Sequence, residues 1–118
     1  MDLGHWKHFG PIPKVWVGFV YLITSPTGKM YIGRKNRFIK RSKVKESNWR
    51  NYSGSSKSLS ADIKAMGGES FTFKILHFCK SLSEIAIMET TEILTRNALF
   101  SADYYNKYCY LKLINNKK

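Results

Sequence analysis

Three side chains in this sequence could take part in the hydrolysis of a phosphodiester: Tyr21, Tyr31 and Glu89. The tyrosines belong to two short apolar segments on either side of a Ser-Pro-Thr-Gly turn, and the second segment leads into the most basic stretch of the chain. A tyrosine hydroxyl can orient or deprotonate water, but its ordinary pKa near ~10 means that it needs nearby positive charge to act as a base. The sequence does not assign the role of base to one of the two, and each could instead be an ordinary aromatic of a sheet.

Glu89 has an unusual position in a predicted helix. It lies one turn after Ile85 and one turn before Ile93, which places its carboxylate inside the apolar stripe. A charge in such a position is costly without a partner, so we expect a metal ion or an arginine nearby, and an ordinary ion pair is the alternative to a catalytic role. Glu92 could join the same metal, but Arg96 four residues further on favours a helix ion pair for it.

The two tyrosines are predicted to lie on a hairpin. Residues 16–23 are apolar on both alternating faces, as in a central strand, and a second strand runs roughly over residues 29–34. The turn at residues 25–28 predicts antiparallel pairing. An odd-length connection such as residues 24–28 would place Tyr21 and Tyr31 opposite each other on one face, whereas an even-length connection would separate them across the sheet.

The remaining elements alternate between helices and a third strand. The fold class is α/β of the α+β kind: a small, mainly antiparallel three-stranded sheet flanked by helices. Periodicity and glycine signals predict a short helix from about Asn36 that carries Phe38 and Arg41, then a polar loop over residues 46–55 and a helix over residues 56–66. A strand is expected over residues 71–78, with its odd positions facing inward at its start. A capping pattern predicts a last helix from Ser81 to about Asn97.

The ends of the chain differ in character from its middle. Residues 1–15 contain Pro11 and Pro13 and have no strand or helix period, so we expect an arm that covers the sheet or lies along a nucleic-acid backbone. Residues 16–110 are expected to form a single domain, and residues 111–118 a basic C-terminal tail.

The composition points to a polyanionic partner. The net charge is +12 over 118 residues, and nucleic acid explains it better than a membrane surface because no apolar run approaches the ~20 residues of a spanning helix. The first residues lack the basic and apolar regions of a signal peptide, so we expect a cytoplasmic protein. Cys79 and Cys109 lack metal-site spacing and are expected to be buried, reduced thiols.

The basic stretch is the expected phosphate-facing surface. Between Arg34 and Arg50 there are eight Lys or Arg residues against Glu46 alone. Trp49 and Tyr52 could stack on a base or equally pack against the domain. The candidate nucleic-acid contacts are Arg34, Lys35, Arg37, Lys40, Lys43, Lys45, Trp49, Arg50 and Tyr52.

These features together resemble the GIY-YIG nuclease family over roughly residues 16–108. The two family motifs are similar to Phe19-Val20-Tyr21 and Tyr31-Ile32-Gly33. By resemblance, the family's helix arginine falls on Arg41, its metal-binding glutamate on Glu89 and its late asparagine on Asn106. Phe19 stands where the first motif has glycine, Glu92 stands where Trp or Tyr is usual, and Tyr52 substitutes for the accessory histidines of some members.

The resemblance implies a metal-dependent endonuclease that acts on DNA, expected to be double-stranded, as a monomer or a homodimer. Its catalytic residues would be Tyr21, Tyr31, Arg41, Glu89 and Asn106, with Mg²⁺ or Mn²⁺ on Glu89. Arg41 could instead make a simple phosphate contact, and Asn106 could be a turn residue. A loop over residues 49–55 resembles one in phage-encoded members, which suggests a free-standing homing-type enzyme. The alternatives are a non-catalytic DNA- or RNA-binding module and a small ribonucleoprotein component.

Overall fold

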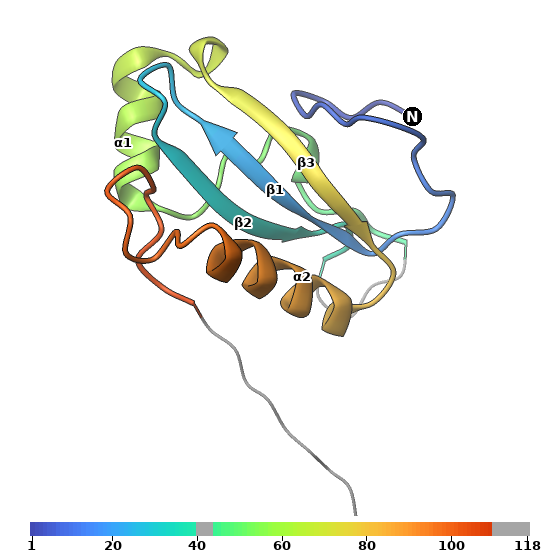
Figure 1. The fold of residues 1–118 in the computed structure, drawn as a ribbon. Coiled ribbons are helices and arrows are strands. Elements are labelled where there is room, and N and C mark those ends of the chain that lie inside the picture. Colours follow the sequence, from blue (N-terminus) through green and yellow to red (C-terminus); the bar gives the residue numbers. More distant parts are fainter. Residues whose placement is uncertain (40–43, 110–118) are drawn as a thin grey trace, which may run out of the picture.

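The computed structural model describes residues 1–39 and 44–109. Its centre is an antiparallel sheet in the order β2-β1-β3, formed by β1 (Gly18–Thr24), β2 (Met30–Asn36) and β3 (Thr72–Cys79). Figure 1 shows α1 (Lys57–Met66) at one end of the sheet and α2 (Leu82–Thr95) along β2. The predicted fold class, a small antiparallel sheet of three strands flanked by helices, is confirmed.

Both helices begin after a capping serine, and the sequence predicts this cap at Ser81. The Ser56 side chain accepts a hydrogen bond from the Leu59 N–H, and the Ser81 side chain accepts one from the Glu84 N–H. Helix α1 ends at Gly67, whose φ of 87° is easily reached only by glycine. Helix α2 ends two residues before the predicted Asn97. Two short 3₁₀ turns, η1 (Trp49–Asn51) and η2 (Gly68–Ser70), complete the described elements.

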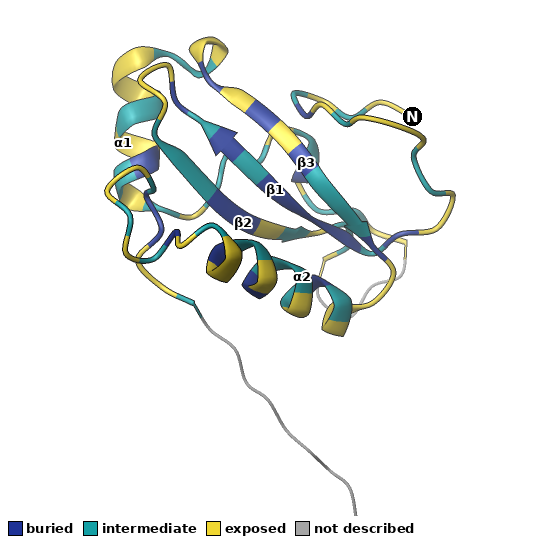
Figure 2. Cartoon of the chain, in the orientation of Figure 1, coloured by how far each residue is buried: buried dark blue, intermediate teal, exposed yellow. Residues whose placement is uncertain are grey.

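Strand β1 is buried on both faces of the sheet. Phe19, Tyr21 and Ile23 belong to one hydrophobic cluster, which includes Leu59 of α1. Val20 belongs to the other cluster, with residues of α2 such as Ile85. Figure 2 shows β1 buried along most of its length. The double burial explains why this segment is an apolar run without alternation.

The hairpin register keeps the two tyrosines on one face. Tyr21 pairs with Gly33, and Tyr31 pairs with Ile23, so the two rings are diagonal neighbours whose centroids lie 6.2 Å apart. The connection runs over residues 25–29 and has odd length, which confirms the predicted common face. The expectation that the two tyrosines lie directly opposite each other is wrong, because each pairs with a different residue of the facing strand. The reason is that Ser25 and Lys29 close the turn, one residue later than predicted.

A bulge in β3 changes which residues face inward. The register shifts between Val20, which pairs with His77, and Tyr21, which pairs with Ile75. Leu76 is the extra residue of the bulge. Before it, odd residues such as Ile75 face the cluster that contains Tyr21, and after it the even residue Phe78 faces that cluster. The predicted odd positions at the start of the strand are confirmed.

The helix predicted to start near Asn36 is wrong in its described part. Strand β2 continues through Asn36, and Phe38 forms an antiparallel bridge with Glu46. Backbone bonds from Ile39 N–H to the Lys45 carbonyl and from Ser47 N–H to the Arg37 carbonyl extend this pairing. The segment is extended because these partners satisfy its backbone groups. The predicted positions Lys40, Arg41 and Lys43 and the tail 111–118 lie outside the described residues.

The N-terminal arm packs along β3. Lys7 donates its N–H to the Phe73 carbonyl and accepts from the Ile75 N–H, while the His5 ring stacks on Phe73 with 3.9 Å between centroids. Trp6 is buried in the adjoining cluster. Residues 5–7 therefore cover the sheet, which was one of the two expected roles.

Both cysteines were expected to be buried, which the structure confirms for Cys79 but not for Cys109. Cys79 is buried, Cys109 is half-buried, and both are free thiols. Burial and the nearby Glu84 raise the pKa of Cys79 to about 11. Within residues 1–39 and 44–109, no helix is long and apolar enough to cross a membrane.

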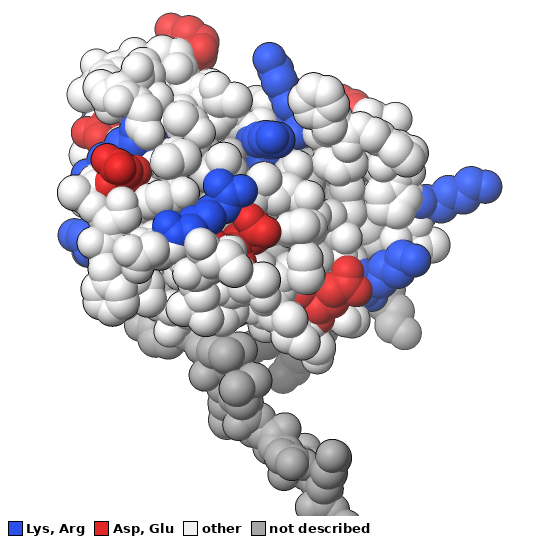
Figure 3. All heavy atoms as spheres, in the orientation of Figure 1, with Lys and Arg blue, Asp and Glu red and all other residues white. Residues whose placement is uncertain are grey.

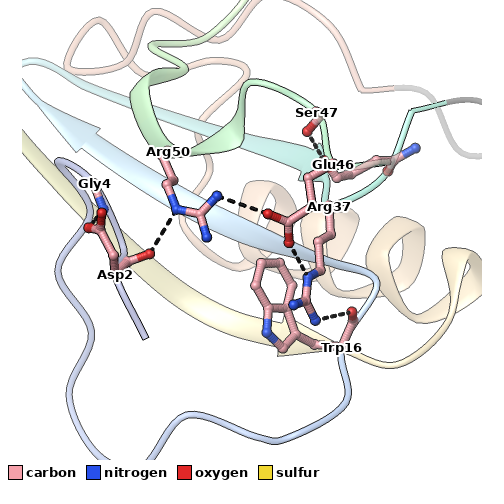
Figure 4. Close-up of polar contacts among 8 residues, drawn as sticks. Asp2, Gly4, Trp16, Arg37, Glu46, Ser47 and Arg50 are labelled. Atoms are coloured by element: carbon pink, nitrogen blue, oxygen red, sulfur yellow. Dashed lines mark hydrogen bonds and ion pairs between the residues drawn. The ribbon is translucent and has the colours of Figure 1, made fainter. Parts of the chain in front are cut away.

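Glu46 ties the extended segment to η1 through two arginines (Figure 4). Its Oε2 lies 2.8 Å from Arg37 Nε, and its Oε1 lies 2.9 Å from Arg50 Nη1. Arg50 also donates to the Asp2 carbonyl, and the Arg37 guanidinium lies 4.4 Å from the centre of the Trp16 ring. The bonds from Arg37 and Arg50 hold the pKa of Glu46 below its ordinary value.

We expect Glu46→Gln to lower the free energy of unfolding by about 1 kcal/mol at neutral pH, the scale of one or two partly exposed ion pairs. Because the folded-state pKa is depressed, this stabilisation is present above the ordinary pKa of a glutamate and is lost as the pH falls through the folded-state pKa. Urea unfolding at neutral and acidic pH measures the difference. The exposed Glu69→Gln serves as control, and a difference that stays constant into the acid range would contradict the assignment.

Candidate active site

A cleft of about 520 Å³ lies at the outer edge of β2. Its walls come from the N-terminus of α1, from α2 and from residues 105–109. Tyr21 and Tyr31 reach it from the face of the sheet that packs on α1, while Arg34 and Glu89 reach it from the face that packs on α2. The cleft also includes Asn106, so four of the five predicted catalytic residues line one cavity, and the fifth, Arg41, lies outside the described residues.

Tyr21 reaches the cleft by crossing over Gly33. The two residues pair across the hairpin, and a Cβ atom at Gly33 would clash with the hydroxyl and ring atoms of Tyr21. Glycine at this position therefore lets the tyrosine of the central strand extend to the sheet edge. The whole residue is 1% exposed, so Tyr21 forms a buried part of the cleft wall, with its hydroxyl beside Gly33.

Tyr31 and Tyr52 surround the Tyr21 ring. The half-buried Tyr31 has its hydroxyl 3.4 Å from the Ser55 hydroxyl, and Tyr52 packs edge-on against Tyr21 with 6.2 Å between centroids. Lys35 places its Nζ 4.0 Å from the centre of the Tyr52 ring. This arrangement puts Tyr52, the predicted substitute proton donor, next to the predicted tyrosine pair.

Both cleft tyrosines are held in the protonated form. Burial raises the pKa of Tyr21 well above its ordinary value, and the neighbouring Tyr31, Tyr52 and Glu89 raise it further. Burial also raises the pKa of Tyr31, against a lowering by the Ser55 hydroxyl. A tyrosine in this cleft can therefore orient water as it stands, and it can act as a base only when positive charge is added beside it.

Glu89 has the arginine partner that its place in an apolar stripe requires. Its Oε1 lies 3.6 Å from Arg34 Nε, and its side chain is 20% exposed. Burial raises the pKa of Glu89, and the charge of Arg34 opposes that rise. Glu92 instead bonds Arg96 at 2.8 Å, which confirms the predicted helix pair, and also His77 at 3.1 Å.

The chemistry of the cleft fits a hard divalent cation held by one carboxylate. Glu89 is the carboxylate that lines the cleft within the described ranges, and the cavity leaves room for waters and phosphate oxygens beside it. Mg²⁺ is commonly bound in this way because it keeps several waters. Among residues 1–39 and 44–109, no cluster of three or more His, Cys, Asp or Glu could form an all-protein metal site.

Asn106 fastens the C-terminal segment to the edge strand. The side chain is 6% exposed, its Oδ1 accepts from the Ile32 N–H at 2.9 Å and its Nδ2 donates to the Ile32 carbonyl at 2.8 Å. Nearby, Met30 donates to the Asp103 carbonyl and accepts from the Tyr105 N–H. Asn106 thus takes the place of a neighbouring strand at the cleft wall.

The predicted nucleic-acid contacts differ in how far their side chains are buried or ion-paired. Trp49 is fully buried and packs edge-on against Trp16, so the prediction that it binds nucleic acid is wrong, and its alternative of packing is confirmed. Arg37 and Arg50 are bonded to Glu46. Lys45 is exposed, and Arg34 lines the cleft. On the face in Figure 3, basic and acidic side chains adjoin one another rather than forming a uniform basic surface.

Sequence reasoning missed two cations at the cleft. Lys57 is the first residue of α1, and Lys107 follows Asn106. Ser55, Ser56 and Ser58 also line this wall. The predicted start of the helix at residue 56 was the available signal, because a helix N-terminus favours anions.

The comparison with known protein families indicates an endonuclease family. A family model described as "Putative endonuclease segE, GIY-YIG domain" matches residues 6–109. No curated protein and no solved structure matches the chain.

We expect Gly33→Ala to lower the free energy of unfolding by about 1–3 kcal/mol, because the added methyl group would displace the Tyr21 ring from a packed position. Gly68→Ala is the matched control, since the nearest atom to its Cβ would be Ile63 Cγ2 at 3.9 Å. Urea unfolding of the three proteins measures the effect. A Gly33→Ala protein as stable as the unsubstituted chain would contradict the proposed crossing.

We expect Asn106→Ala to cost about 1–3 kcal/mol of unfolding free energy, because the N–H and carbonyl of Ile32 lose their partner. Asn106→Asp keeps the acceptor and loses the donor, so it should destabilise at neutral pH and recover toward acid pH as the new carboxyl group becomes protonated. Chemical unfolding across pH measures both, with the exposed Asn48→Ala as control. Equal stability of all three variants would show that the hydrogen bonds between Asn106 and Ile32 do not stabilise the fold.

Proposed function

Because this chain belongs to the GIY-YIG endonuclease family, we propose that it is a metal-dependent DNA endonuclease that hydrolyses phosphodiester bonds in double-stranded DNA. The observation that carries the proposal is the convergence of Tyr21, Tyr31, Arg34 and Glu89 on one cleft at the edge of β2. These groups come from both faces of the sheet, and folding a hairpin does not require them to meet. The net charge of +12 supports a nucleic-acid substrate.

Each cleft residue has a role that its position supports. Glu89 would hold Mg²⁺ or Mn²⁺, which when bound supplies Lewis-acid stabilisation of the phosphate and of the leaving oxygen. The hydroxyls of Tyr21 and Tyr31 would orient the attacking water, whose oxygen forms the new bond to phosphorus as the bond to the leaving oxygen breaks. The attacking water gives up its proton to solvent, and the leaving oxygen takes a proton from solvent. Arg41 lies outside the described residues, and by family resemblance alone it would neutralise charge on the phosphate in the transition state.

The source and biological role belong to the same proposal at a finer level. The similarity of the loop over residues 49–55 to a phage-encoded loop supports a free-standing homing-type enzyme. Since Trp49 of that loop is buried, the loop would read DNA through other residues, such as Tyr52. A single module of this size covers limited DNA surface, so either a monomer with a short site or a homodimer fits.

A second candidate function is DNA or RNA binding without hydrolysis. The observation that favours it is the raised pKa of both cleft tyrosines, which leaves neither hydroxyl ready to act as a base without added positive charge. Such a module would bind nucleic acid equally well after the loss of Glu89. The single substitution Glu89→Ala therefore distinguishes the two functions.

We expect the protein to cleave supercoiled plasmid in the presence of Mg²⁺ and to lose cleavage in EDTA. Glu89→Ala and Arg41→Ala should each lower the cleavage rate by about a hundredfold or more, the scale of losing one group that stabilises transition-state charge. Gel analysis over time measures the rate, and the relaxed and linear products separate nicking from double-strand cutting.

Glu69→Ala is the matched control, because it removes an exposed carboxylate at η2 that does not line the active-site cleft. Its cleavage rate should equal that of the unsubstituted chain. Persistent cleavage by Glu89→Ala would assign the activity to another site or a contaminant. Binding of plasmid without cleavage by any variant would favour the second function.

A further inference from the structure

Among the described residues, the ion pair between Arg34 and Glu89 has the longest distance between nitrogen and oxygen. Arg34 Nε lies 3.6 Å from Glu89 Oε1, whereas Arg37 and Arg96 approach their glutamates to 2.8 Å. Glu46 and Glu92 also each bond a second side chain, Arg50 and His77. Glu89 is therefore the least neutralised of the three ion-paired carboxylates.

The position of Arg34 leaves its guanidinium able to move. Arg34 lies on the edge strand β2, its side chain is 47% exposed, and it lines the same cleft as Glu89. A guanidinium at 3.6 Å gains Coulomb attraction but lacks the short bidentate geometry that fixes an arginine on a carboxylate. A divalent cation would compete for the Glu89 oxygens with twice the charge of Arg34.

We propose that Arg34 is a displaceable counterion of Glu89. It neutralises the carboxylate while no cation is bound there, and on cation binding it turns to a phosphate oxygen of DNA in the same cleft. This inference rests on the proposed function, because it assigns a second residue to the same metal and phosphate site. Arg34 thus couples the two binding events: the cation releases the guanidinium, and the released guanidinium adds a contact to the substrate.

The first experiment measures Mn²⁺ binding to the full chain without DNA by isothermal titration calorimetry. Removing the competitor by Arg34→Gln should tighten Mn²⁺ binding about two- to fivefold, the range expected for one partly exposed ion pair. Arg34→Lys keeps the charge and should restore most of the original affinity. Glu89→Ala should abolish binding.

Lys57→Gln is the matched control, because Lys57 also lines the cleft but its ammonium has no ion pair with Glu89. It removes the same charge, so it reports the general electrostatic effect of a cation in the cleft. Its Mn²⁺ affinity should stay close to that of the unsubstituted chain. Thermal unfolding of each variant checks that the substitutions leave the fold intact.

The second experiment measures how the binding of a short DNA duplex depends on salt. With Ca²⁺ on the carboxylate, Arg34→Gln should reduce the slope of log affinity against log salt by about one, as for the loss of one phosphate contact. In EDTA the slope should be the same with and without the substitution, because Arg34 is then engaged by Glu89. Lys57→Gln should affect the slope equally in both conditions.

The outcomes separate this inference from the proposed function. Equal Mn²⁺ affinity of the unsubstituted and Arg34→Gln proteins, an equal gain in Lys57→Gln, or no Mn²⁺ binding by any protein would each overturn the role of Arg34. A slope change that is the same in Ca²⁺ and EDTA would overturn its transfer to phosphate. If the expected binding changes occur and plasmid is never cleaved, the counterion role stands and the nuclease proposal falls.

Discussion

The crossing of Tyr21 over Gly33 positions the rest of the site. Tyr21 belongs to the central strand, where it would ordinarily end in the core, and the absence of a side chain at Gly33 lets its hydroxyl reach the outer edge of β2. The register that pairs these two residues also brings Tyr31 to the same face. Tyr52 then packs against the tyrosine pair, and Glu89 approaches from the opposite face of the sheet around the same edge. The catalytic proposal thus depends on one backbone pairing.

Both outer edges of the small sheet carry additional backbone pairing. Residues near Lys7 bond to β3, while residues 103–106 bond to β2 through Met30 and through the amide of Asn106. An uncovered edge strand exposes unpaired N–H and carbonyl groups, which favours association with other chains. Covering the edge of β2 with a short segment rather than a full strand leaves space beside Ile32 and Arg34. The same segment therefore protects the edge and forms a wall of the cleft.

The large positive charge is only partly available to a substrate. Arg37 and Arg50 are bonded to Glu46, and Arg96 is bonded to Glu92, so these arginines stabilise the fold through internal contacts. Among residues 1–39 and 44–109, the cations that line the cleft come from three different segments: Arg34 on β2, Lys57 at the start of α1 and Lys107 in the C-terminal segment. A count of charges along the sequence overstates the basic surface formed by residues 34–50, because neighbouring side chains on an extended chain point in opposite directions.

Local patterns in the sequence determined most elements of this protein. The hairpin, both capped helices, the inward start of β3 and the pairing of Glu92 with Arg96 depend on residues close in the chain, where periodicity, turn chemistry and capping act. The tertiary structure alone decided that Phe38 pairs with Glu46 instead of starting a helix, that Trp49 is buried, and that Lys57 and Lys107 join the cleft. Each of these depends on contacts between residues in different segments of the chain. Such contacts are set by how the two faces of the sheet are covered, and no local pattern encodes that.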